Sequence, residues 1–195
     1  MRLFVALPLP EDIKQRIETL RGGIPDARWI PPGNAHLTLA FLGDVPDIEI
    51  ADIGLALGQI DYPAFDLQIE TVGVFGNTKR PRILWAGVKL NDDLIRLQQK
   101  VAIALNTAGY QIQDRRFKPH ITLARVHMSP YEKIRQYLSD NALFKCPPIP
   151  VTEFTLFSSH LAHSGAIYTE EMMFDLEPVS ERSPLSSHPH NAPVI

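Results

Sequence analysis

Two short segments of this chain of 195 residues are nearly identical. The sequence HLTLA at residues 36–40 recurs as HITLA at residues 120–124, so four of the five letters match over a spacing of 84 residues. Each copy alternates polar and apolar residues, so each copy is expected to begin a β-strand. A strand motif that occurs twice predicts a fold with two similar halves around a pseudo-two-fold axis.

The two motifs divide their side chains between the faces of the strands. Residues two apart share a face, so the His and Thr of each copy point one way and the apolar residues between them point the other way. The apolar residues can then enter a core. We expect His36, Thr38, His120 and Thr122 to line one cleft between the two strands.

The hydrophobic pattern of the rest of the chain predicts strands and helices in mixed order. Strands are expected near residues 3–7, 36–42, 65–75, 83–90, 117–126, 151–161 and 166–176, and helices near 11–20, 47–57, 92–106 and 130–138. Asp47 is expected to cap the second helix. Hairpins beside strand–helix units favour the α+β class: a two-lobed, duplicated fold with antiparallel sheets lining a central cleft and helices outside.

The chain is expected to form one domain. A hydrophobic content of 45% is sufficient for one core, which we place in residues 1–176. Residues 177–195, EPVSERSPLSSHPHNAPVI, are rich in Pro and Ser and have no core pattern. We predict a disordered tail there.

Composition excludes several classes of protein. The single cysteine, Cys146, cannot form an internal disulfide and fits a cytoplasmic protein. No segment approaches the roughly 20 apolar residues of a membrane span, and no Gly-rich phosphate loop is present. A net charge of −3 argues against a surface that coats nucleic acid. The basic clusters at residues 79–82 and 115–118 are expected to form only a local track for RNA.

Two imidazoles and two hydroxyls in one cleft suit in-line attack on a phosphodiester. One imidazole takes a proton from the entering water, and the other gives a proton to the departing sugar oxygen. Histidine suits both steps because its ordinary pKa lies near 6.5. The hydroxyls of Thr38 and Thr122 can donate to the phosphate oxygens. Neither His160 nor His163 has a third ligand at a useful spacing, so no metal site is expected.

Arg125 follows the second motif directly and is the candidate cation for the phosphate. It lies five residues after His120, and strict alternation would put it on the opposite face of the strand. It can reach the cleft only where the strand ends or bulges near Ala124.

These segments resemble the RNA 2′,3′-cyclic phosphodiesterases of the two-histidine phosphoesterase superfamily, also called the 2′-5′ RNA ligase family. The resemblance covers about residues 1–176 and includes RLFVAL, HLTLAFLG, PRILWAGV, RFKPHITLAR and FSSHLAHSGAIYTEEMMFDL. It implies an enzyme, without a cofactor, that acts on an RNA end or nucleotide carrying a 2′,3′-cyclic phosphate and leaves a 2′-phosphomonoester.

The resemblance also implies a role for each site residue. His36 would be the proton donor and His120 the proton acceptor. Thr38, Thr122 and Arg125 would hold the phosphate, and Phe41 would contact the nucleotide. We expect a monomer that does not associate with a membrane.

Three other functions remain open at the level of the sequence. The same residues could join RNA ends through a 2′-5′ linkage, because a site that stabilises one transition state serves both directions. The chain could be a non-catalytic module that binds nucleotides or RNA. It could also hydrolyse a small cyclic phosphate.

Overall fold

The computed structural model describes residues 1–77, 80–112, 116–127, 129–162 and 165–178. The strands are β1 (Arg2–Pro8), β2 (Arg28–Trp29), β3 (His36–Asp44), β4 (Phe65–Leu67), β5 (Ile69–Asn77), β6 (Arg80–Val88), β7 (His120–Arg125), β8 (Ile149–Val151), β9 (Glu153–Ala162) and β10 (Gly165–Asp175). The helices are α1 (Glu11–Glu18), α2 (Ile50–Gly58), α3 (Asp92–Thr107) and α4 (Tyr131–Asp140). These elements match the predicted α+β class.

Eight of the strands form one antiparallel sheet. The strand order is β10-β9-β1-β3-β7-β6-β5, and β2 pairs with β7. Strands β4 and β8 form a separate pair. The two motif strands, β3 and β7, are neighbours at the centre, but their only paired residues are Leu37 and Ile121. The sheet therefore divides into two halves that diverge from this point.

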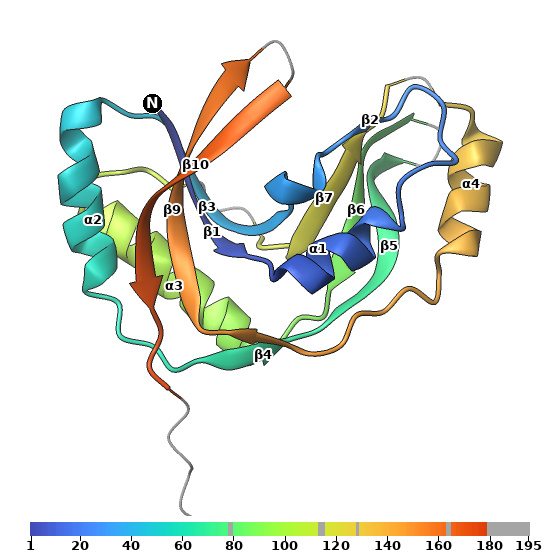
Figure 1. Cartoon of the computed structure of the whole chain (residues 1–195). Coiled ribbons are helices and arrows are strands. Elements are labelled where there is room, and N and C mark those ends of the chain that lie inside the picture. Colours follow the sequence, from blue (N-terminus) through green and yellow to red (C-terminus); the bar gives the residue numbers. More distant parts are fainter. Residues whose placement is uncertain (78–79, 113–115, 128, 163–164, 179–195) are drawn as a thin grey trace, which may run out of the picture.

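Helices cover the outside of both halves. Figure 1 shows α2 and α3 beside the half formed by β10, β9, β1 and β3, and α4 beside the half formed by β5, β6 and β7. Helix α3 follows β6 in sequence but packs against β3 and α2. It buries Leu94, Leu97, Val101 and Leu105, and the Asn91 side chain caps it by accepting a hydrogen bond from the Leu94 amide at 2.7 Å.

The buried apolar residues form one main cluster that runs from Leu3 to Leu176 and draws on both halves of the sheet. Glu177, the first residue of the predicted tail, is still attached to this body. Its amide donates to the Tyr62 carbonyl at 2.9 Å, and its carbonyl accepts from the Ala64 amide at 2.7 Å. Residues 179–195 lie outside the described part of the chain, so their disorder stays a prediction.

Three local predictions were wrong at their boundaries. Asp47 does not cap α2: it lies in a 3₁₀ turn, Asp47–Glu49, and the α-helix begins at Ile50. The strand predicted from residue 117 begins only at His120, because Pro119 has no N–H to donate. The strand predicted over 65–75 is divided at Gln68, since its first part pairs with β8 and its second with β6.

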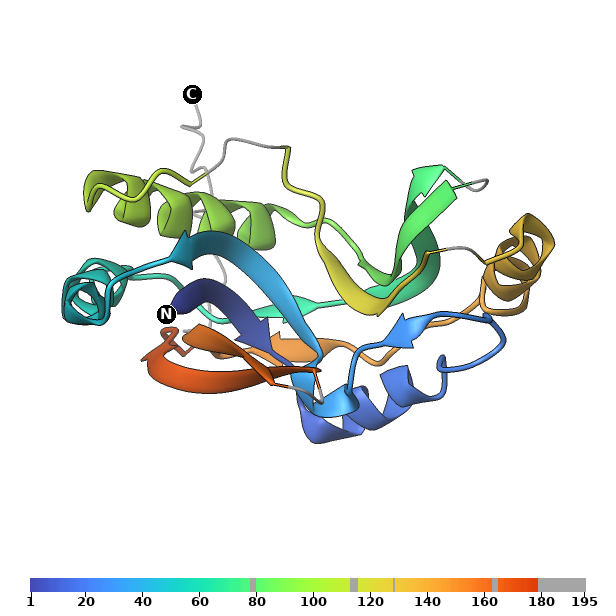
Figure 2. The same ribbon diagram turned by 90° about the horizontal axis from the view of Figure 1, so that it is seen from above.

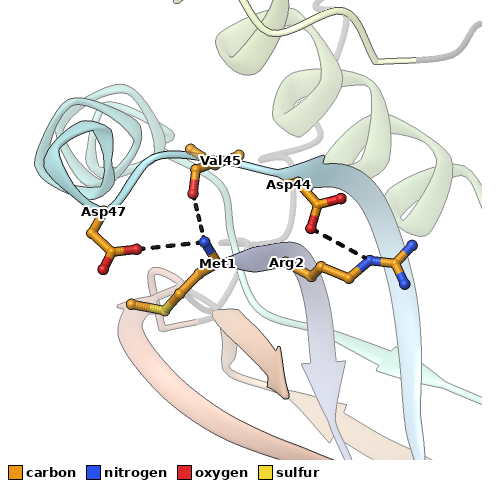
Figure 3. Close-up of polar contacts among 5 residues, drawn as sticks. All are labelled: Met1, Arg2, Asp44, Val45 and Asp47. Atoms are coloured by element: carbon orange, nitrogen blue, oxygen red, sulfur yellow. Dashed lines mark hydrogen bonds and ion pairs between the residues drawn. The ribbon is translucent and has the colours of Figure 1, made fainter. Parts of the chain in front are cut away.

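The Asp47 carboxylate instead forms an ion pair with the amino terminus of the chain (Figure 3). The Met1 ammonium donates to the Val45 carbonyl at 2.7 Å and lies 3.4 Å from Asp47 Oδ1. Beside it, Arg2 Nε lies 3.9 Å from Asp44 Oδ1. These contacts attach the start of β1 to the end of β3, although exposed ion pairs of this kind contribute at most about 1 kcal/mol.

Candidate active site

A cavity of about 340 Å³ lies between the two halves of the sheet. Its lining includes all six residues that the sequence predicted: His36, Thr38, Phe41, His120, Thr122 and Arg125. Three come from β3 and three from β7, and Figure 2 shows these strands passing each other at the centre of the molecule. The repeated motif therefore meets its own copy across one site.

A β-bulge in β7 explains how Arg125 reaches this cavity. Trp85 of β6 pairs with Thr122, but the next residue, Leu84, pairs with Ala124, so Leu123 is the extra residue. Leu123 and Ala124 are both buried, and Arg125 returns to the exposed face that carries His120. Strict alternation would have turned Arg125 away from the cavity. The bulge interrupts this alternation next to Ala124, where the sequence analysis required an interruption.

The first motif contains the same bulge. Ala6 of β1 pairs with Thr38, and its neighbour Val5 pairs with Ala40, which leaves Leu39 as the extra residue. Phe41 is thereby returned to the face of His36, with 68% of its surface exposed. Phe41 and Arg125 occupy equivalent positions in the two halves, five residues after each histidine.

Equivalent hydrogen bonds orient the two imidazoles. Nδ1 of His36 lies 2.7 Å from the Asn34 carbonyl oxygen, and Nδ1 of His120 lies 2.7 Å from the Lys118 carbonyl oxygen. A carbonyl oxygen only accepts, so both Nδ1 atoms carry hydrogen and Nε2 is the nitrogen left to exchange a proton. Nε2 of His36 lies 3.1 Å from Thr38 Oγ1.

Aromatic side chains hold both rings in place. The ring centroid of His36 lies 4.8 Å from that of Phe4 and 5.3 Å from that of Tyr168, which meets it edge-on. The ring of His120 meets Phe75 edge-on at 4.7 Å. These contacts restrict rotation of the rings while leaving one edge of each toward the cavity.

Burial lowers the pKa of both histidines below the value of 6.5 for a free imidazole. The hydrogen bond to the Asn34 carbonyl partly opposes this effect at His36, and repulsion from the charge on His120 lowers the His36 pKa further. At His120, the hydrogen bond to the Lys118 carbonyl partly opposes the lowering of the pKa by burial. Both rings are therefore mostly neutral at pH 7, and a bound anion would favour protonation.

Among the residues that the structure describes, no three His, Cys, Asp or Glu side chains gather in a group that could hold a metal ion. His163 lies outside those residues. Within the same ranges, no helix has the length and apolar character to cross a membrane.

Comparison with known proteins assigns the chain to a family. Residues 7–85 and 88–168 match the family described as LigT like phosphoesterase. The chain belongs to this family. It is 32% identical over 181 residues to an RNA 2′,3′-cyclic phosphodiesterase of Archaeoglobus fulgidus, covering 90% of this chain and 100% of that protein. A Thermotoga maritima protein of the same name is 33% identical over 176 residues, covering 86% and 91%.

Solved structures of LigT-like phosphoesterases share the fold. The crystal structure of E. coli LigT in the apo form is 30% identical, has a TM-score of 0.72 and covers 90% of this chain and 97% of that one. The same protein complexed with 3′-AMP matches with a TM-score of 0.71. The predicted family and fold class are both confirmed.

Several residues of this LigT-like site were not found from the sequence. Phe4, Tyr168 and Arg2 also line the cavity. The rings of Phe4 and Tyr168 contact each other edge-on with centroids 5.1 Å apart. Burial raises the pKa of Tyr168, and the positive charge of Arg125 partly opposes this rise. Pairing of β1 with β3 brings Phe4 and Arg2 to the site, and pairing of β1 with β9 and of β9 with β10 brings Tyr168 there. No local pattern in the sequence indicates such a pairing.

Proposed function

We propose that this chain hydrolyses 2′,3′-cyclic phosphate ends of RNA to 2′-phosphomonoesters, without a metal ion, through acid–base catalysis by His36 and His120. The observation that carries this proposal is the pair of imidazoles that line one cavity, each with Nδ1 hydrogen-bonded to a backbone carbonyl, so that Nε2 is the nitrogen that exchanges a proton. The names of the relatives, and the E. coli LigT structure with 3′-AMP, support the same substrate class.

In the proposed reaction, the oxygen of a water molecule attacks phosphorus as Nε2 of His120 takes the water proton. The bond between phosphorus and the ribose 3′-oxygen breaks, and protonated Nε2 of His36 gives its proton to that oxygen. The entering and leaving oxygens lie on opposite sides of phosphorus, which requires a group on each side. The 2′-phosphate leaves, and the two rings exchange protons with solvent before the next cycle.

Thr38, Thr122 and Arg125 would bind the non-bridging phosphate oxygens, where negative charge increases in the transition state. Hydroxyl and guanidinium donors that are already in position stabilise that charge with little reorganisation. The strongly exposed ring of Phe41 would contact the nucleoside. We place the protein in the cytoplasm as a monomer, where the buried and unpaired thiol of Cys146 stays reduced.

The test is to incubate the purified protein with an oligonucleotide that ends in a 2′,3′-cyclic phosphate, in the presence of a chelator, and to identify the product. We expect an oligonucleotide with a 2′-phosphate. The wild-type protein and the variants His36→Ala and His120→Ala are compared under the same conditions. Equal turnover by all three proteins, or no turnover by any, would contradict the proposal. A joined product in the presence of a 5′-hydroxyl oligonucleotide, without hydrolysis, would favour ligation instead.

A further inference from the structure

A second, larger hollow opens from the catalytic cavity. Its volume is about 760 Å³, and it shares Thr38, Phe41, Gly43 and His120 with the first cavity. Its far side is formed by the segment that leads into β7, including Arg116 and Lys118. One ligand can therefore occupy this hollow and place a phosphate between the two histidines at the same time.

The divergence of the central strands creates this space. Beyond the pair Leu37 and Ile121, β3 no longer pairs with β7, and residues 39–43 of β3 line the hollow. The Gln98 amide of α3 donates to the Leu39 carbonyl at 3.4 Å and covers part of this strand. Figure 2 shows α3 and the segment before β7 on one side of β3.

A third hollow of about 560 Å³ continues from the second along the outer face of α3. The two share Gln98, Ile112, Arg116 and Phe117. We call the two together the α3 groove. It leads away from the catalytic cavity and is much larger than one water molecule or one phosphate requires.

The charge of the α3 groove is opposite to that of the chain. The net charge of the protein is −3, yet no Asp or Glu is among the described residues that line either hollow. Arg116 and Lys118 line the second hollow and are exposed. A groove of this charge attracts a polyanion, and two cations at short spacing suit successive phosphates.

Aromatic rings line the same groove. Phe41 is 68% exposed, and Phe75 and Phe117 are half-buried. Exposed rings beside cations are the surface on which single-stranded nucleic acids bind, because bases stack on the rings while the backbone follows the cations. A cyclic mononucleotide at the catalytic cavity would have no second phosphate to contact Arg116 and Lys118.

We propose that the α3 groove binds the nucleotides on the 5′ side of the terminal cyclic phosphate, so that the substrate is single-stranded RNA and not a cyclic mononucleotide. This inference rests on the proposed function, because the terminal phosphate must lie between His36 and His120. The phosphates of the preceding nucleotides contact Arg116 and Lys118. One preceding base stacks on the ring of Phe75 or Phe117.

The test compares kcat/KM for a tetranucleotide and for a mononucleotide that both end in a 2′,3′-cyclic phosphate. We expect the wild-type protein to prefer the tetranucleotide by on the order of 10-fold or more, which is within the contribution of one stacked base and its phosphates. Arg116→Glu and Gln111→Glu each place a carboxylate in the groove and should reduce that preference. Lys133→Glu, an exposed residue on α4 that lines neither hollow, is the matched control and should not change it.

Salt dependence provides a second measurement. For single strands, the slope of log affinity against log salt changes by about 0.7 for each phosphate neutralised. The slope for the tetranucleotide should therefore become shallower by about this amount in Arg116→Glu and stay unchanged in Lys133→Glu.

Three results would overturn the inference and leave the proposed function intact. The first is equal kcat/KM for both substrates in the wild-type protein. The second is the same preference in Arg116→Glu as in Lys133→Glu. The third is a loss in Arg116→Glu confined to joining with a 5′-hydroxyl oligonucleotide, which would assign the groove to an incoming strand. Absence of hydrolysis of either substrate by the wild-type protein would instead contradict the proposed function.

Discussion

Replacement of the two histidines, one at a time and together, tests the proposed site most directly. A general acid or base contributes roughly 10² to 10⁴ in rate, so His36→Ala and His120→Ala should each lower kcat/KM by about that factor. At about 1.36 kcal/mol for each factor of ten, the loss is about 2.7 to 5.4 kcal/mol of transition-state stabilisation. The double variant should lose little more than the worse single variant, because acid and base act in the same step.

The structure indicates that such losses cannot come from unfolding. His36 contacts the rings of Phe4 and Tyr168 at centroid distances of 4.8 and 5.3 Å, and His120 contacts Phe75 at 4.7 Å. Each aromatic pair contributes about 0.5 to 1.5 kcal/mol, which is small beside the roughly 5 to 15 kcal/mol by which a domain is stable. Both rings border an open cavity, so water can replace them at the carbonyls that they leave.

The assay is kcat/KM on a cyclic-phosphate substrate, together with thermal melts of all four proteins. We expect each single variant to melt within about 12 °C of the wild type, since the two aromatic contacts of His36 contribute at most about 3 kcal/mol and about 1 kcal/mol shifts Tm by roughly 2 to 4 °C in a chain of this size. Near-normal turnover in either single variant with an unchanged melt would show that the repeat is structural. A double variant that loses the product of the two single losses would show that the histidines do not act on one phosphorus.

Three further predictions follow from the same geometry. Because burial lowers the pKa of both His36 and His120 below 6.5, the state of the pair that holds one proton is most abundant below pH 6.5. The value of kcat/KM should therefore peak below pH 6.5 and fall at higher pH as this last proton is lost. A maximum above pH 7.5 would contradict the assignment of the two histidines as acid and base. Arg125→Met should lower kcat/KM by roughly 10² to 10³ and Thr122→Val by about 10-fold, because a charged donor stabilises the developing phosphate charge more than one hydroxyl does. A larger loss in Thr122→Val than in Arg125→Met would be inconsistent with the proposed contacts. Turnover should be unchanged after dialysis against a chelator, since the leaving oxygen is protonated by His36, and activity restored only by a divalent ion would show that a metal takes part.

The sequence by itself determined the central features of this protein. The repeated motif located both histidines and both threonines, and the alternation of polar and apolar residues assigned them to an open face. The periodicity of residues 92–106 predicted α3, observed as Asp92–Thr107. These features depend on neighbours within one strand or helix, so the pattern of residues along the chain is sufficient to find them.

Only the tertiary structure decided which other residues join the site. Arg125 and Phe41 face the cavity because β7 and β3 each bulge at a Leu, and a bulge exists only relative to the partner strand, β6 or β1. Phe4 and Tyr168 meet because β1, β9 and β10 are neighbours in the sheet, although the two residues are far apart in sequence.

The α3 groove has the same kind of origin. Its two cations lie directly before β7, whereas its floor is formed by β3. Strands β3 and β7 diverge from the single pair Leu37 and Ile121, which leaves the groove between them. The basic cluster near Arg116 was visible in the sequence, but its position beside the catalytic cavity was not. Local alternation assigns residues to the two faces of a regular strand, whereas bulges and the distance between strands depend on long-range pairing, which the order of residues along one strand does not contain.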